Sequence, residues 1–449
     1  MTIINQFIMK KLLYLILAML LVILYTGCNK EDEPWDPGLG TGAGMLKIAF
    51  VSDIHYMAPE LLVQDGPAFQ DYLARDPKLL VESGEIVQQL ITQLNADKPN
   101  LLIIPGDLTK DGETISHEQI IDLLKTGLSP KIKILTLPGN HDIANPDALS
   151  YNGETTSPVP SVTEEEFVSL YQDFGYSDAI ARDATTLSYV AEPYKNFRVI
   201  FIDATIRPNP DDPNEPPLDG EISEETLDWI DTQMADAQLN PKMQVIAVMH
   251  HNLIDHWTGQ SSIYPGYVIN NSDEAAARLY AAGLHLIFTG HSHANDITQY
   301  TEGNLYDIET GSTVSYPMPY RLVNYWNNDS LEITTKHIDG IELHGIPAQD
   351  YAYDFLNDGM TNMFTAILKT LFEVTDPLAT EVGAFESSGY IEYNAGDEVL
   401  TPEESQDLNS YSNRLIVQGA PLAAVTLNTT YTAWNTDLVP VDNNILIDY

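Results

Sequence analysis

The sequence predicts an α/β protein built as a four-layer αββα sandwich, in which two sheets pack face to face and helices cover the outer faces. Two observations lead to this fold class. Strand-like and helix-like segments alternate from about Leu46 to Ile338. After Gly290 the alternation gives way to consecutive strands, which imply a second sheet. These strands are expected over residues 295–300, 304–310, 319–326 and 330–338.

The N-terminus has the features of a bacterial export signal, because two lysines precede an almost unbroken apolar run. Cys28, the only cysteine, follows a Thr-Gly pair and resembles the lipobox cysteine that is acylated in bacterial lipoproteins. We expect a signal peptide over 1–27, lipidation of Cys28 and a flexible tether over 28–44. An uncleaved signal anchor is the alternative, since the apolar run approaches the roughly 18 residues that begin to span a bilayer.

The residues after Cys28 resemble the lysine-plus-acidic tag with which some outer-membrane lipoproteins reach the cell surface. We therefore expect an extracytoplasmic protein on a lipid anchor in the outer membrane, with display at the cell surface as a further expectation. The formal charge of −44 at pH 7 repels polyanions. Long nucleic acid is accordingly not an expected partner.

The alternating region, taken as a catalytic domain over 45–340, contains three recognisable helix starts. Ser116 with Gln119 and Thr163 with Glu166 have the capping-box spacing. Ser223 is a plain N-cap candidate. The expected helices lie near residues 78–95, 117–127, 164–174, 223–237 and 272–282.

The composition changes again after about His344. Long apolar-periodic stretches occupy 349–374 and 402–435, and the second opens with Thr-Pro-Glu-Glu at Thr401, a strong helix start. Residues 341–449 are expected to form a smaller, mainly helical C-terminal domain.

Five short polar clusters each follow an apolar run of β-type residues. They are Asp53-Ile54-His55, Gly106-Asp107, Gly139-Asn140-His141-Asp142, Met249-His250-His251 and Gly290-His291-Ser292-His293. Each cluster falls where a buried strand would end in a loop, which is where open α/β sheets place their active sites. We therefore expect the clusters to form one site.

The clusters supply imidazole nitrogen, carboxylate oxygen and amide oxygen, which together suit Mn, Fe or Zn better than Ca or Mg. Seven side chains are too many for one ion and suit two. The candidate ligands are Asp53, His55, Asp107, Asn140, His250, His291 and His293. One carboxylate must bridge the two ions, and Asp107 is the expected bridge.

The clusters resemble the signature blocks of the calcineurin-like metallophosphoesterase superfamily, DxH, GD, GNH[DE], a lone H after a strand, and GHxH, over roughly 45–295. The resemblance implies two metal sets that share one aspartate. These sets are Asp53, His55, Asp107 and His293 for one metal, and Asp107, Asn140, His250 and His291 for the other. By the same pattern His141 is not a ligand.

Two such cations, roughly 3.5–4 Å apart, can deprotonate a shared water that attacks phosphorus. His141 would then protonate the leaving oxygen or stabilise its charge, and Asp142 is expected to orient it. Two divalent ions, two aspartates and a hydroxide leave about one positive charge at the site, which suits a singly charged phosphodiester.

A closer resemblance, carried by GDLTKDGE, PGNHDIANP, DFGYSDAI, LDWI and HHNLIDH, is to bacterial cyclic-nucleotide phosphodiesterase-like proteins that append a helical domain. It implies hydrolysis of cyclic mononucleotides or other phosphodiesters. The chain departs from the purple acid phosphatase pattern, because Lys110 stands where those enzymes carry a tyrosine ligand.

Four further histidines have weaker assignments. His251 and His256 are expected to orient the metal ligands or to touch the substrate. His285 lies within an apolar strand and is expected to be a core residue, and His117, beside a helix cap, is expected to be solvated.

Tyr316, Tyr320 and Arg321 lie in a segment that could return to the metal edge, where they would suit a base and a phosphate. Ordinary strand and loop packing is the alternative. The chain as a whole is expected to be a lipid-anchored phosphodiesterase for small cyclic nucleotides. The alternatives are a phosphomonoesterase or broad-specificity phosphoesterase on sugar or lipid phosphates, and a non-catalytic surface-binding lipoprotein, which would require a lost metal ligand.

Overall fold

The computed structural model describes residues 45–208, 216–326 and 330–448. The predicted signal peptide, Cys28 and the tether therefore lie outside the described residues, as does the middle of the Pro- and Asp-rich segment 205–221. Within the described ranges, no helix is both long enough and apolar enough to cross a bilayer.

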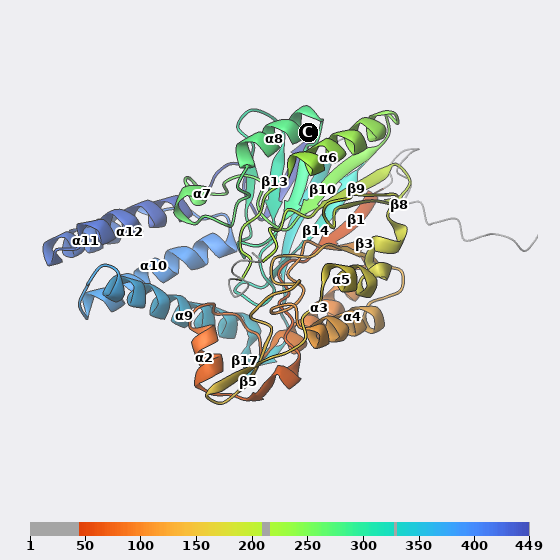
Figure 1. The fold of residues 1–449 in the computed structure, drawn as a ribbon. Coiled ribbons are helices and arrows are strands. Elements are labelled where there is room, and N and C mark those ends of the chain that lie inside the picture. The colour runs from red at the N-terminus through yellow and green to blue at the C-terminus, as the bar shows by residue number, and fades with distance from the viewer. Residues whose placement is uncertain (1–44, 209–215, 327–329, 449) are drawn as a thin grey trace, which may run out of the picture. The chain divides into compact units, whose positions relative to one another are not determined.

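Two sheets form the centre of the fold (Figure 1). The strands of the first are β18 (Asn444–Asp448), β15 (Ser330–His337), β14 (Pro319–Trp326), β1 (Met45–Phe50), β3 (Leu101–Ile104) and β4 (Lys133–Thr136), in spatial order. The strands of the second are β12 (Ile297–Gln299), β13 (Tyr306–Glu309), β11 (Leu286–Thr289), β10 (Gln244–Met249), β9 (Phe197–Ile202), β8 (Tyr189–Tyr194) and β7 (Ala181–Arg182). Strands β1, β3 and β4 are parallel, as are β9, β10, β11 and β13.

The two sheets pack on each other through apolar side chains, and Phe50 of β1 stacks on Phe288 of β11 with ring centroids 3.8 Å apart. Helices α3 (Ser83–Asp97) and α4 (Thr114–Gly127) pack on the first sheet. On the opposite side of the sandwich, α6 (Glu224–Gln238) and α8 (Ser272–Ala281) cover the second sheet (Figure 1). The predicted four-layer α/β sandwich is thus confirmed, because each sheet buries one face on the other sheet and one under helices.

Shorter elements surround the sandwich. They are α2 (Pro67–Leu73), α5 (Glu164–Leu170), α7 (Gln260–Ile263), β2 (Leu62–Gln64), β5 (Leu149–Asn152), β6 (Thr155–Pro158), β16 (Glu342–Leu343), β17 (Ile346–Pro347) and three 3₁₀ turns at Pro59–Leu61, Gln172–Phe174 and Tyr176–Asp178.

The predicted helix starts have different outcomes. Thr163 and Glu166 form the expected capping box, and Ser223 accepts from the backbone N–H of Thr226. The prediction for Ser116 is wrong, because α4 begins at Thr114 and places Ser116 inside the helix. The Ser116 hydroxyl instead accepts from the N–H of Ala58 at 3.2 Å, which ties α4 to the loop after β1.

The four consecutive strands after Gly290 divide between the two sheets, and do not make a sheet of their own. β12 and β13 extend the second sheet beside β11, whereas β14 lies antiparallel to β1 in the first. The alternation of apolar and polar side chains identifies a strand but does not show which strand it pairs with. The sequence therefore predicted these strands but not their places in the two sheets.

The C-terminal segment is mainly helical. Its helices are α9 (Ala348–Thr370), α10 (Leu378–Ala395), α11 (Pro402–Gln418) and α12 (Pro421–Trp434). The stretch predicted over 402–435 is two helices, since Gly419 ends α11 at φ 92° and Pro421 starts α12. Strand β18 follows and pairs antiparallel with β15, so the end of the chain returns to the first sheet.

Candidate metal centre

The five polar clusters follow the carboxyl ends of parallel strands in both sheets. Asp53 and His55 come after β1, Asp107 after β3, and Asn140 after β4. His250 follows β10, and His291 and His293 follow β11. The structure brings all seven predicted ligands together and buries six of them, with His293 half-buried, and we call this group the metal centre.

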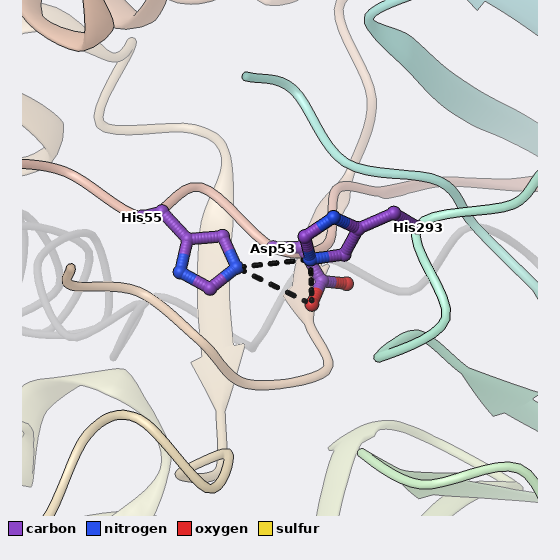
Figure 2. Close-up of side chains that lie close together, drawn as sticks. All are labelled: Asp53, His55 and His293. Atoms are coloured by element: carbon purple, nitrogen blue, oxygen red, sulfur yellow. Dashed lines mark hydrogen bonds and ion pairs between the residues drawn. The ribbon is translucent and has the colours of Figure 1, made fainter. Parts of the chain in front are cut away.

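The first half of the metal centre is formed by Asp53, His55 and His293 (Figure 2). The Nε2 atoms of the two histidines lie 3.1 Å apart, and Asp53 Oδ1 lies 3.8 Å from that of His55 and 3.5 Å from that of His293. Among the described residues, Asp53 Oδ1 has no hydrogen-bond partner although it is buried. Convergent acceptors of this kind fit a bound cation, since an unpartnered buried carboxylate oxygen is costly.

The second half contains Asp107, His250, His291 and Asn140. One ligand atom from each of the first three lies within 4.8 Å of the others. Asn140 donates through Nδ2 to the carbonyl of Pro217, which leaves its Oδ1 directed at His250 Nε2 at 3.0 Å. The amide oxygen is therefore available as a ligand.

Asp107 belongs to both halves. Its Oδ2 lies 3.6 Å from His55 Nε2 and 3.3 Å from His250 Nε2. The other oxygen, Oδ1, accepts the backbone N–H of His141 at 2.9 Å. A carboxylate held in this way faces both groups at once, which suits the bridging position expected for it.

The surroundings keep two of the ligand histidines, His291 and His293, neutral, whereas burial of His250 is outweighed by the Asp107 carboxylate, which raises the pKa of His250 to about 9. His250 Nδ1 lies 2.8 Å from the carbonyl of Pro105, so the proton assigned to Nδ1 leaves Nε2 free to face Asp107. Burial and the Lys78 ammonium lower the pKa of His293 to about 3. Burial likewise holds the pKa of His291 well below its usual value. Neutral imidazole is the form that binds metal ions.

The backbone at these ligands is strained. Asp53, His55, Asp107, His291 and His293 have φ values of 51°, 42°, 48°, 80° and 64°. Residues other than glycine rarely adopt this left-handed region, at a cost of order 1–3 kcal/mol each. Such strain concentrates at functional sites, where the surrounding fold holds side chains in directions that a relaxed turn would not give.

His141 lies beside the metal centre and keeps 20% of its side chain exposed. Its ring meets that of His55 edge-on, with centroids 4.9 Å apart. Its Nδ1 lies 2.7 Å from Asp111 Oδ1. Asp111, and not the neighbouring Asp142, is therefore the carboxylate that orients His141.

The expectation that Asp142 orients His141 is wrong. The Asp142 carboxylate accepts the N–H groups of Leu108, Thr109 and Gly139 at 2.9–3.2 Å. It therefore ties the loop that carries Asp107 to the loop that carries Asn140, and acts on the shape of the site.

Two charged pairs near the metal centre were missed by the sequence analysis. The buried Lys110 ammonium contacts Asp111 and lies 4.2 Å from the centre of the Tyr72 ring. Lys110 and Asp111 were visible in GDLTKDGE, where their spacing from Asp107 could have indicated a role. Buried Lys78, paired with Asp76 at 2.7 Å, lies in the irregular segment before α3, because that helix begins at Ser83 and not near residue 78 as expected.

The remaining histidines are placed as follows. His251 packs on the His291 ring, with centroids 4.4 Å apart, and its Nε2 lies 2.9 Å from the carbonyl of Leu218. His256 does not contact a predicted ligand, since its ring lies between Asp296 at 2.8 Å and Asp307 at 3.3 Å. Those carboxylates turn it away from the metal centre.

Two expectations about isolated histidines are corrected. His117 is buried and not solvated, with Nδ1 2.7 Å from the Tyr171 hydroxyl and Nε2 2.9 Å from the carbonyl of Asp142. His285 is only half-buried and not in the core, because it precedes β11 and its Nδ1 bonds the carbonyl of Asn304.

The segment with Tyr316, Tyr320 and Arg321 does not bring these side chains to the metal centre. Tyr316 packs edge-on against Tyr353 of α9, and the Tyr320 hydroxyl donates to Asp97 at 2.7 Å. Arg321 is buried and donates to the carbonyls of Glu309 and Asp442. The strand pairing of β14 directs the last two away, so ordinary packing is the correct reading.

The comparisons with known proteins agree with this geometry. The family model described as calcineurin-like phosphoesterase matches residues 46–295, more than half of the chain. The chain therefore belongs to the calcineurin-like phosphoesterase family and is a metal-dependent phosphoester hydrolase. This family uses a dinuclear metal site, for which the grouped His and Asp side chains are the candidates.

Similar solved structures include a dimetal phosphatase from Danio rerio, at 13% identity and a TM-score of 0.45, covering 65% of this chain and 96% of that chain. Another is a purple acid phosphatase from yellow lupin (Lupinus luteus) seeds, at 12% identity and a TM-score of 0.43, covering 68% of this chain and 53% of that chain. No curated protein matches the sequence.

Proposed function

We propose that this phosphoesterase hydrolyses phosphodiesters, with small cyclic nucleotides as its substrates. The observation that carries the proposal is a cavity of about 160 Å³ with aromatic walls, which we call the aromatic cavity. It lies beside the metal centre, because its lining includes Ser292, between two predicted ligands in sequence, and Tyr267, whose ring centroid lies 5.0 Å from that of His291.

The walls of the aromatic cavity come from both the catalytic loops and the C-terminal helices. Trp257 and Tyr264 face Tyr390 of α10 and Trp434 of α12, and Arg75 lies at the same cavity. Flat aromatic side chains offer stacking surfaces for a nucleobase. A cyclic nucleotide could place its base here and its phosphate at the metal centre.

Bound at the metal centre, two divalent or trivalent ions of Mn, Fe or Zn would supply an activated water and neutralise phosphoryl oxygens. The protein side chains do the rest. His141, anchored by Asp111, presents its ring beside His55 and can pass a proton to the leaving oxygen. Lys78 acts electrostatically on His141, but its ammonium is paired with Asp76 at 2.7 Å, so the pair adds no net charge.

The substrate class is tested by comparing kcat/KM on bis-p-nitrophenyl phosphate, p-nitrophenyl phosphate, and 2′,3′- and 3′,5′-cyclic AMP. We expect the diester to be cleaved faster than the monoester and one cyclic nucleotide to be the best substrate. A faster monoester would favour the phosphomonoesterase alternative. Absence of turnover with Mn, Fe and Zn would favour the non-catalytic lipoprotein.

The role of the aromatic cavity is tested by Trp434→Ala. Loss of one stacking surface, worth about 1–3 kcal/mol per base, should raise KM for the cyclic nucleotide about tenfold or more. Because Trp434 is buried and also packs on Tyr264 and Tyr390, Tm is measured beside KM to separate lost stacking from a packing defect. Leu422→Ala, at an exposed position on the same helix, is the matched control and should leave KM unchanged. Equal KM values for both variants would remove the cavity from the substrate site.

We also propose that the chain is a lipoprotein anchored through Cys28 outside the cytoplasm, in the outer membrane or at the cell surface. The export-type N-terminus and the single cysteine support this. Wild-type protein should incorporate labelled palmitate and lose residues 1–27, and Cys28→Ser should do neither. Protease treatment of intact cells distinguishes surface display from a periplasmic orientation.

A further inference from the structure

A second group of buried carboxylates lies beyond the loop that carries His291 and His293. Asp296, Glu398 and Asp442 each offer one oxygen within 4.8 Å of the others, and all three side chains are buried. We call these three residues the carboxylate cluster. Asp442 also belongs to an overlapping, more exposed group with Asp397 and Asp437.

Unpartnered polar atoms point to a missing ligand in this cluster. Glu398 is only 6% exposed, and within the described ranges its Oε2 has no hydrogen-bond partner. The same holds, for that part of the chain, of Oδ1 of the fully buried Asn295. Asn295 precedes Asp296 in sequence, and its Nδ2 donates to Asn443, the neighbour of Asp442. Each such orphaned oxygen is costly unless something binds it.

The basic groups nearby are already engaged. The Arg321 guanidinium donates to backbone carbonyls, including those of Asp442 at 2.6 Å and Asp296 at 3.3 Å. The His256 ring lies between Asp296 and Asp307. These two cations therefore face neutral carbonyls or a single member of the cluster, and no basic side chain of the described residues forms an ion pair with Glu398.

The titration of the carboxyl groups reflects this shortage of positive charge. Burial, followed by the nearby Asp296 carboxylate, raises the pKa of Glu398 to about 10 and that of Asp442 to about 8. Both carboxyl groups are therefore harder to ionise without a cation beside them. A divalent ion would favour their charged form.

We propose that Asp296, Glu398 and Asp442 bind a hard divalent cation, with Ca²⁺ as the ion that fits best. The cluster offers only oxygen, whereas the metal centre offers imidazole nitrogen as well. All-oxygen sites select Ca²⁺ or Mg²⁺, and a flexible set of carboxylates from separate segments suits the adaptable coordination of Ca²⁺.

The site would join the C-terminal segment to the catalytic loops. Asp296 lies three residues after His293, Glu398 follows α10, and Asp442 precedes β18. The N–H of Asn295 already donates to the carbonyl of Asn394 at the end of α10. Because α10 and α12 carry Tyr390 and Trp434, a cation here would also hold one wall of the aromatic cavity.

The test uses the full-length protein with its metal centre loaded with Mn²⁺. Equilibrium dialysis against ⁴⁵Ca²⁺ and a thermal unfolding scan with and without millimolar Ca²⁺ are compared for four proteins: wild type, Glu398→Gln, Asp442→Asn and Asp354→Asn. Asp354, exposed on α9, is the control that makes the same charge change elsewhere. Wild type and Asp354→Asn should each retain one Ca²⁺ and unfold at a higher temperature when it is present.

Glu398→Gln and Asp442→Asn should lose both the bound Ca²⁺ and the Ca²⁺-dependent rise in Tm, while keeping their Mn²⁺. Glutamine retains the size of the side chain, so a folded Glu398→Gln protein is expected. The proposal is overturned if wild type retains no Ca²⁺, or if both substitutions leave Ca²⁺ retention unchanged. None of these readouts depends on the substrate, so they stand apart from the proposed activity.

Discussion

The metal centre and the carboxylate cluster lie at opposite ends of the loop between Gly290 and Asp296, and they differ in the ligand atoms that they offer a cation. The metal centre mixes carboxylates with imidazoles whose nitrogens face inward. The carboxylate cluster offers oxygen alone. The difference teaches that one short loop can serve two kinds of metal chemistry, because the ligand atoms and not the burial decide which ion binds.

The two groups also differ in where their residues come from. The ligands of the metal centre follow strands of the sandwich, so the sheets themselves place them. The carboxylate cluster combines one residue of the catalytic loops with Glu398 and Asp442 of the C-terminal segment. Loss of the first should therefore affect chemistry, and loss of the second should affect how firmly the C-terminal segment is held.

The largest effect is expected for Asp107→Ala. Asp107 faces both halves of the metal centre, so its loss should release both ions and reduce kcat by more than about 10⁴-fold, beyond the usual contribution of one proton-transfer group. Metal content by elemental analysis, measured beside activity, checks this. A variant that kept two ions per chain would show that Asp107 does not bridge them.

A smaller loss is expected for His141→Ala, which should keep both metals and lower kcat by about 10²–10⁴-fold, the usual contribution of one acid–base group. His141 lies beside the ligands without being one of the predicted seven. The discriminating measurement is again metal content against kcat. Metal loss in this variant would make His141 a ligand and contradict the assigned role.

Asp111→Asn should have a weaker effect of the same kind, a fall in kcat of about 10–100-fold, because Asp111 acts by positioning His141. The pH profile separates positioning from general damage. Burial and the Lys78 ammonium lower the pKa of His141, but the Asp107 and Asp111 carboxylates outweigh them and raise it. Loss of the Asp111 carboxylate should therefore shift the part of the pH profile that depends on His141 to lower pH. An unchanged profile would leave Asp111 with a structural role only.

The sequence predicted the parts that depend on neighbouring residues. The Thr163 capping box needs only Glu166, three residues on, and it forms as expected. Ser116 has the same spacing to Gln119, but its hydroxyl accepts the backbone N–H of Ala58, a residue far away in sequence. Local patterns cannot show such competition, because it arises only when distant segments pack together.

The same reason explains the outcome at the candidate site. The clusters at strand ends identified the residues that meet, because parallel strands bring their carboxyl ends to one edge. The partner of His141 was missed, since adjacency favoured Asp142 while the fold brings Asp111 to its ring. The carboxylate cluster had no local signal at all, because Asp296, Glu398 and Asp442 meet only through the return of the C-terminal segment to the sandwich.

Glu386 sharpens the comparison as a buried carboxyl outside both groups. It lies in α10 with the Thr430 hydroxyl at 3.4 Å, and burial raises its pKa from 4.5 to about 7. Below pH 4.5 the carboxyl is protonated in the folded and unfolded states alike. Between pH 4.5 and about 7 only the unfolded state ionises, so folding stability falls across this range and stays lower above it.

Glu386→Gln should remove this loss. Its free energy of unfolding should match that of wild type below pH 4.5 and exceed it by about 1–3 kcal/mol above pH 7. Denaturant titrations across pH 4–8 measure the difference, with Asp354→Asn as the exposed control. Because Glu386 stands apart from the carboxylate cluster, Ca²⁺ should not change this difference. If Ca²⁺ abolished this difference in stability, Glu386 would share the cation. Glu386 would then belong to the carboxylate cluster.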